Sequence, residues 1–235
     1  MYRTALAAML LWAPLVAHSA FVDVNPLAPP VSLGAGTTAA ADPSLAGVVI
    51  ADDVNNFSGT SFNGQYQTRV VRRDDTGTLD FYYRIVSFTD QAQDRVLRDF
   101  RIGDFADWQT SATWRPDGVG TENPLIAVKF PQAPQCVACD GINLSFADFA
   151  AGVPSNFNSG DDSRFMVIRT SATAFTTTSA DVYLVTVPGV PFDQFLSAGF
   201  SVYAPVPEPS SLTLFALGLL MLAWRFSRRA GTAIA

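Results

Sequence analysis

Two cysteines, Cys136 and Cys139, offer the most recognisable chemistry in the sequence. A Cys-x-x-Cys pair can act in thiol redox exchange when a helix N-terminus lowers the pKa of its first thiol, usually within a βαβ unit. Here the pair lies between Pro134 and the turn-forming Asp140 and Gly141. That setting favours a local structural disulfide, as expected in an oxidising compartment, over a redox centre. A metal site built on both thiolates is the least favoured reading, because no further Cys or His could complete it.

Histidine chemistry is excluded from the exported part of the chain. The single histidine, His18, lies in an N-terminal segment that has the features of a cleaved signal peptide. Without it the chain has no Ser-His-Asp or Cys-His nucleophile system, no histidine base and no histidine zinc ligand. We therefore assign no catalytic residue and no metal ligand, expect no cofactor, and predict that the protein is not an enzyme.

Short clusters of Asp residues are the remaining candidates for a metal site. They are Asp52 with Asp53, Asp74 and Asp75 with Asp80, and Asp161 with Asp162. Calcium takes Asp oxygens on flexible loops, but no cluster fits the EF-hand loop with its terminal Glu. Asp is also a common turn residue, and the sequence favours solvated turn residues over calcium ligands.

Carbohydrate chemistry needs either paired carboxylates or exposed rings. A glycosidase holds two carboxylates about 5 to 10 Å apart, and nothing in the sequence selects such a pair. Aromatic side chains could stack on sugars, although core packing is their more frequent fate. The candidates are Trp108, Trp114, Tyr82 and Tyr203. A secreted carbohydrate-binding or glycosidase-like protein is thus the alternative to a non-enzymatic one.

The charge of the chain argues against nucleic acid as a partner. The 235 residues include 21 acids and 15 bases, a net charge of −6. Residues 20–205 carry 20 of the acids and 11 of the bases, so the exported part has a net charge of −9. An anionic domain lacks the basic surface that binds phosphate backbones.

The N-terminal end, residues 1–19, is predicted to be a secretory signal peptide. Arg3 supplies its positive region, and an apolar run from Ala5 to Ala17 follows without a polar helical face. Small residues at Ala17 and Ser19 favour cleavage after Ser19.

The C-terminal end combines three features in order. An extended Pro207-Glu208-Pro209 box bars a helix from starting earlier. The uncharged run Leu212–Trp224 would span about 20 Å as a helix, so flanking residues must extend it to 211–227 to approach a slab of about 30 Å. The basic residues that follow, which favour a cytoplasmic end, are Arg225, Arg228 and Arg229.

This arrangement over residues 206–235 resembles the PEP-CTERM family of sorting signals. The resemblance implies recognition by exosortase, a membrane-embedded cysteine transpeptidase-like enzyme, and cleavage near the box. It also implies a Gram-negative host that makes exopolysaccharide, which becomes a possible partner. We therefore expect an exported protein that is anchored transiently in the inner membrane and then placed at the cell surface or in the extracellular matrix, with a structural or adhesive role.

The exported part has the period-two pattern of β-strands. In residues 78–87 the apolar face consists of Leu79, Phe81, Tyr83 and Ile85, and the other face of Asp80, Tyr82 and Arg84. With residues 67–73 and the turn at 74–77, this stretch predicts a hairpin. Further candidate strands are 47–51, 95–105, 125–130, 141–146, 164–170, 181–187 and 200–204.

These strands predict an all-β exported domain, a jelly-roll-like β-sandwich over residues 46–205. Residues 20–45 are rich in Ala, Pro, Gly, Ser and Thr and are expected to form a flexible lead-in. Residues 89–102 could form a capped helix, but the surrounding pattern favours a strand from Arg95.

Overall fold

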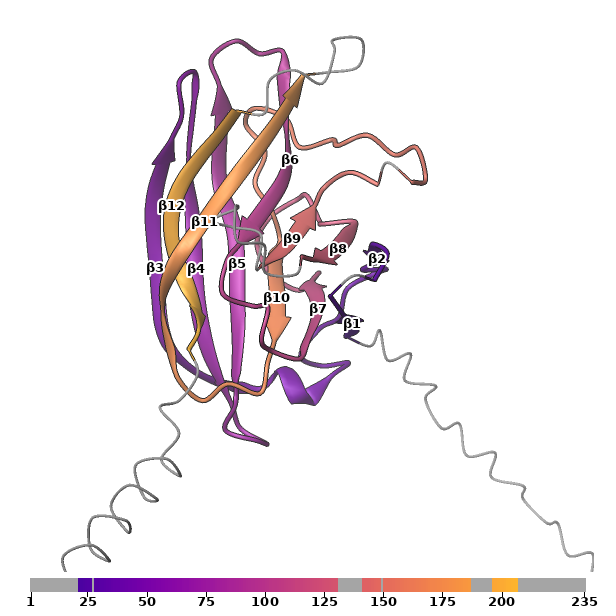
Figure 1. The fold of residues 1–235 in the computed structure, drawn as a ribbon, viewed down its shortest axis with the longest axis vertical. Coiled ribbons are helices and arrows are strands. Elements are labelled where there is room, and N and C mark those ends of the chain that lie inside the picture. The colour runs from indigo at the N-terminus through magenta and orange to yellow at the C-terminus, as the bar shows by residue number, and fades with distance from the viewer. Residues whose placement is uncertain (1–20, 27, 131–140, 149, 187–195, 207–235) are drawn as a thin grey trace, which may run out of the picture.

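The computed structural model describes residues 21–26, 28–130, 141–148, 150–186 and 196–206. This part of the chain is all-β and contains two six-stranded antiparallel sheets (Figure 1). Sheet A has the strand order β1-β7-β10-β5-β4-β3, and sheet B has the order β12-β11-β6-β9-β8-β2. The strands are β1 (Val22–Val24), β2 (Val31–Ser32), β3 (Gly47–Ser58), β4 (Phe62–Arg73), β5 (Leu79–Asp90), β6 (Arg95–Ile102), β7 (Thr110–Arg115), β8 (Ile126–Lys129), β9 (Ile142–Ser145), β10 (Phe165–Arg169), β11 (Phe175–Thr186) and β12 (Leu196–Pro205).

The connections combine hairpins with crossings between the two sheets. Strands β3, β4 and β5 form a meander within sheet A, and β11 pairs with β12 within sheet B. From β5 through β8, by contrast, each successive strand changes sheet. The first strands, β1, β2 and β3, also change sheet in succession, so the chain crosses between the two sheets at several points.

The main core lies between the sheets and is rich in aromatic rings. The face of β5 that the sequence predicts to be apolar is fully buried there, with Leu79, Phe81, Tyr83 and Ile85 at 0% exposure. Phe100 and Ile102 of β6 contribute to the same cluster from sheet B. Alternation along β5 and β6 thus supplies one buried layer from each sheet, as in a sandwich.

A second core covers the outer face of sheet A. It is formed by Leu45, Val71, Tyr82, Phe165 and Val167, with Phe21 and Ala39 packed against it. Leu45 belongs to the short 3-10 helix η1 (Pro43–Leu45), whose preceding Asp42 accepts a hydrogen bond from the Ser44 N–H. The outer side of β5, including Asp80 and Tyr82, is consequently buried as well.

The stretch expected as a flexible lead-in therefore contributes fixed elements to the fold. It contains β1, β2 and η1, and Val24, Leu33 and Leu45 are buried. The physical reason is that a few large apolar residues, spaced among small ones, are buried in the two cores: Val24 and Leu33 in the main core, and Leu45 in the second. Composition alone did not reveal these contacts, because the intervening residues are mostly small or polar.

Other local predictions agree with the structure more closely. The predicted hairpin corresponds to β4 and β5, and the ambiguous segment forms the strand β6 from Arg95 rather than a helix. Strands β3 and β11 are longer than expected, and β7 was not predicted. Within the described ranges no helix has the length and apolarity needed to cross a membrane. The expected signal peptide (1–19) and span (211–227) lie outside those ranges.

Candidate ligand-binding groove

An open groove follows the seam between the edge strand of sheet A, β3, and the edge strand of sheet B, β12. It has a volume of about 540 Å³, and its lining residues come from four strands. Those residues are Asp53, Asn55, Asn56, Tyr66, Thr68, Thr177, Gly199, Phe200, Ser201, Val202 and Tyr203. Among the described strands, β3 and β12 each lie at the edge of their sheet, on the same side of the sandwich (Figure 1).

Aromatic side chains form the floor of the groove and tie the two sheets together. The ring centroids of Tyr66 on β4 and Phe200 on β12 are 4.3 Å apart, and Phe57 stacks on Phe200 at 5.6 Å. The Tyr66 hydroxyl donates a hydrogen bond of 2.6 Å to the Ser201 carbonyl. The contacts with Tyr66 and Phe57 hold the Phe200 ring in place. Because Phe200 is only partly buried, part of this side chain remains accessible to a ligand.

Tyr203 and Asp53 form the charged part of the groove. The Tyr203 hydroxyl donates a hydrogen bond to Asp53 Oδ2, and this bond is the main reason that the pKa of Tyr203 is raised to about 12. The Tyr203 backbone is held on both sides, because its N–H donates to Thr68 Oγ1 and its carbonyl accepts from the Tyr83 hydroxyl. The phenol is therefore neutral at physiological pH and its ring is fixed beside the carboxylate.

The exposed polar groups next to this pair belong to β3. Asn55 and Asn56 are exposed, and Gln65 donates a hydrogen bond of 3.1 Å to the Asn56 side-chain oxygen. Asp52, the neighbour of Asp53, accepts hydrogen bonds from Gln67 and Arg69 instead of lining the groove. The groove thus offers amide donors and acceptors, one carboxylate and aromatic surface, a set suited to a ligand with many hydroxyl groups.

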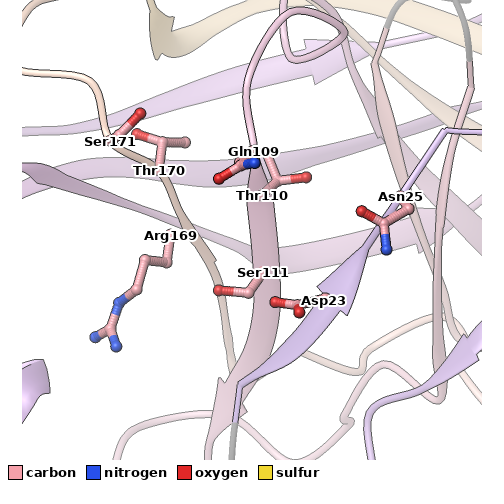
Figure 2. Close-up of a pocket in the computed structure, with 8 residues that line it drawn as sticks. All are labelled: Asp23, Asn25, Gln109, Thr110, Ser111, Arg169, Thr170 and Ser171. Atoms are coloured by element: carbon pink, nitrogen blue, oxygen red, sulfur yellow. The ribbon is translucent and has the colours of Figure 1, made fainter.

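A second, smaller hollow of about 310 Å³ lies across β1, β7 and β10 of sheet A (Figure 2). Figure 2 shows Asp23 and Ser111 close together and the Arg169 side chain extending away from the other labelled groups. Arg169 is committed to Asp80 and Ser44 through its hydrogen bonds. None of the eight described lining residues is aromatic. The hollow therefore lacks the stacking surface of the groove and is the weaker candidate.

The acidic clusters predicted from the sequence are engaged in the fold. Asp75 forms an ion pair with Arg73, and Asp80 forms one with Arg169. Asp161 accepts from the Asn158 N–H, and Asp162 from the Thr121 N–H. Within the described ranges no three His, Cys, Asp or Glu side chains are grouped as metal ligands would be.

The sequence-predicted aromatic candidates have different positions. Tyr203 lines the groove, whereas Tyr82 and Trp114 are buried in the domain and Trp108 is half-buried. Sequence reasoning missed the roles of Asn55, Asn56 and Phe200. The one available signal was the stretch from Asp52 to Asn56, in which four of five residues are polar and Val54 is the exception, a pattern that is typical of a strand exposed on both faces.

Several predicted site residues fall outside the described ranges. They are the disulfide candidates Cys136 and Cys139, and the sorting-signal residues Pro207, Glu208, Pro209, Arg225, Arg228 and Arg229. The structure does show where the sorting segment begins. Strand β12 ends at Pro205, and the Val206 N–H donates a hydrogen bond of 3.2 Å to the Ala174 carbonyl.

Comparison with known families identifies the C-terminal end of the chain. The model of the PEP-CTERM protein-sorting motif matches residues 205–229, which confirms the resemblance predicted from the sequence. The motif marks the chain as an exported protein that is targeted by exosortase and anchored transiently in the membrane before processing. No curated protein and no solved structure matches the chain.

Proposed function

We propose that this exported, exosortase-targeted chain is a non-enzymatic adhesive or structural protein of an exopolysaccharide layer, and that its sandwich binds a sugar polymer along the groove between β3 and β12. The observation that carries the proposal is the convergence of Asp53, Asn55, Tyr203 and Phe200 on one open groove. The sorting motif supports it independently, because it sends the domain to the outside of the cell.

The groove chemistry favours a saccharide over an apolar ligand. Carboxylate and amide side chains can make several hydrogen bonds to the ring hydroxyls of one sugar. An accessible aromatic ring can pack against the apolar face of a pyranose while excluding water. An open groove also suits a polymer, because a long chain need not be enclosed to bind there.

The same inventory favours binding over hydrolysis. Glycoside hydrolysis requires two carboxyl groups flanking the scissile bond. Among the described residues that line the groove, Asp53 alone has a carboxylate. Its neighbour Asp52 is occupied by Arg69 at 2.8 Å and by Gln67 at 2.6 Å. We therefore propose that the polymer is held and not cleaved.

Binding measurements on the exported protein can test whether the polymer binds at this groove. The exported protein is purified as the cell releases it and titrated with exopolysaccharide of the host. Asn55→Ala should weaken binding by about two- to tenfold, the loss expected for one hydrogen bond. Gln109→Ala, at the smaller hollow, is the matched control and should bind as the unchanged protein does.

Two results would contradict the proposal. If Asn55→Ala binds as tightly as the unchanged protein, the groove is not the contact site. If new reducing ends accumulate in the polymer during incubation, the domain is a hydrolase and the adhesive role is wrong.

A further inference from the structure

The charge of the groove distinguishes between classes of sugar. Asp53 is the charged side chain among the described lining residues, and none of the residues in that lining is Lys, Arg or His. The guanidinium nearest to it in the strand pairing, Arg69, binds Asp52 and lies over the Phe165 ring at 4.8 Å. Consecutive strand residues point to opposite faces, so this cation neutralises Asp52 and leaves Asp53 uncompensated on the groove side.

The charge of Asp53 contributes to the raised pKa of two tyrosines that line the groove, Tyr203 and Tyr66. The hydrogen bond to Asp53 is the largest cause of the raised pKa of Tyr203, burial is the second, and the charges of Asp53 and Asp52 raise it further. For Tyr66 burial is the main cause of the raised pKa, and the charge of Asp53 raises it further. Both phenols thus respond to the same uncompensated carboxylate, one on each side of the seam.

The carboxylate retains capacity for a ligand. The Tyr203 hydroxyl uses one acceptor position on Oδ2, and a carboxylate offers about four such positions on its two oxygens. Asp53 is exposed, so a ligand can reach these positions without moving the backbone. The Tyr203 hydrogen bond meanwhile fixes the orientation of the carboxylate.

Resting on the proposed function, we infer that the groove selects polymers whose sugars carry protonated amino groups, and that Asp53 is the residue that determines this specificity. An ammonium group donates charge-assisted hydrogen bonds to a carboxylate, which are stronger than those donated by a sugar hydroxyl. A uronic acid places a second carboxylate against Asp53 in a domain whose sequence already has a net charge of −9 over residues 20–205. Charge therefore ranks amino sugars first, neutral sugars second and uronates last.

The test uses two ligands that differ in charge at the same nitrogen atoms, and the salt dependence of binding isolates the contribution of the charge. A glucosamine tetramer and its N-acetylated counterpart are titrated into the exported protein by calorimetry, at mildly acidic pH where the free amines are protonated. The free-amine tetramer should bind about two- to fivefold more tightly, the range of an exposed ion pair. The preference should disappear at about 1 M salt, where the Debye length falls to about 3 Å.

Variants assign the preference to one carboxylate. Asp53→Asn has nearly the same shape and should lose the preference, because its affinity should fall more for the free-amine tetramer than for the N-acetylated one. Asp23→Asn removes an exposed carboxylate at the smaller hollow and should keep the preference. The salt dependence of the preference in the unchanged protein provides the second measurement of the role of charge if Asp53→Asn does not fold.

The outcomes separate this inference from the proposed function. Equal affinity of the unchanged protein for both tetramers, equal loss of preference in Asp23→Asn and Asp53→Asn, or equal binding of a galacturonate tetramer would overturn the charge selection alone. Failure of every tetramer and of the host polymer to bind would overturn the proposed function itself.

Discussion

Asp80, which the sequence places in an acidic cluster, forms a buried ion pair with Arg169 in the folded domain. It is completely buried on the outer side of β5, where Arg169 Nε and Nη2 donate to its two oxygens at 3.1 and 3.0 Å. Arg169 is in turn held by Ser44 and covered by the Phe21 ring at 3.7 Å. The ion pair thus links the N-terminal segment to sheet A. Removing one partner of a buried pair costs about 3 kcal/mol or more, because the other charge remains buried.

The stability contributed by Asp80 should fall as pH rises. Burial raises the pKa of Asp80 above its ordinary value of 3.8, with Arg169 opposing the shift. Between the ordinary and the raised value the folded state holds more protons than the unfolded state, so stability declines with pH across that window. The difference in unfolding free energy between the unchanged protein and Asp80→Asn should therefore shrink as pH rises above the ordinary value of 3.8, as measured by urea unfolding.

Asp117 serves as a control, because its contribution to stability should change with pH in the opposite direction. Hydrogen bonds from Arg115 lower the pKa of Asp117, and burial opposes them. The contribution of Asp117 to the free energy of unfolding is fully present when the pH is above its ordinary pKa of 3.8. It is lost as the pH falls through the lowered pKa of the folded state. The difference in unfolding free energy between the unchanged protein and Asp117→Asn should accordingly grow as pH rises. Slopes of the same sign in the two variants would contradict this account.

At the scale of elements, the N-terminal segment depends on its close fit against β7. Trp114 Nε1 donates to the Gly34 carbonyl at 3.1 Å, and the Thr37 N–H donates to the Trp114 carbonyl at 2.9 Å. Between them Gly36 has a φ of +69°, and a Cβ built there would lie 2.6 Å from the Trp114 ring and from its carbonyl oxygen. The turn therefore requires glycine for both its backbone conformation and its packing.

Substituting the two glycines of this turn should separate these causes. Gly36→Ala should lower the unfolding free energy by about 3 kcal/mol, since left-handed backbone strain and overpacking add. Gly34→Ala has a similar φ of +56° but open space around the new methyl group, so only the strain of about 1 kcal/mol is expected. Urea unfolding of both variants measures the difference. Equal losses would show that the contact with Trp114 does not matter.

At the scale of the whole molecule, the folded domain and the sorting segment meet without a spacer. Ten residues of β12 pair with β11, and the last of these pairs joins Pro205 to Phe175. The motif match begins at residue 205, and the predicted box follows at Pro207. Processing upstream of Val206 would have to break the hydrogen bond to Ala174 and the strand pairing behind it. We therefore expect processing at or after the box.

Mass spectrometry of the released protein tests this expectation. The C-terminal peptide of the exported form should contain the intact β12 sequence through Val206 and lack residues 225–235. In a host without exosortase, the same peptide should extend to Ala235 and remain with the membrane fraction. Recovery of residues 225–235 on the released protein of a host with exosortase would contradict removal of the segment.

The sequence by itself determined the local features of this protein. The sorting motif and the hairpin of β4 and β5 can each be recognised in a short stretch of the sequence, and the net charge follows from composition alone. Alternation along residues 79–85 correctly placed four side chains in the core, because strand side chains alternate by steric necessity. Strand β7 escaped prediction because its apolar residues are few and its partners β1 and β10 are distant in sequence.

Only the tertiary structure decided what covers Asp80 and where the groove lies. Asp53 and Tyr203 are 150 residues apart, and Ser44 and Arg169 are 125 apart. Such contacts form because the hydrophobic cores bring distant strands together. The residues that surround each partner in the sequence do not indicate which distant residue it will contact. Local sequence thus indicated many of the strands and the sorting motif, while long-range packing created the surface on which the proposed binding depends.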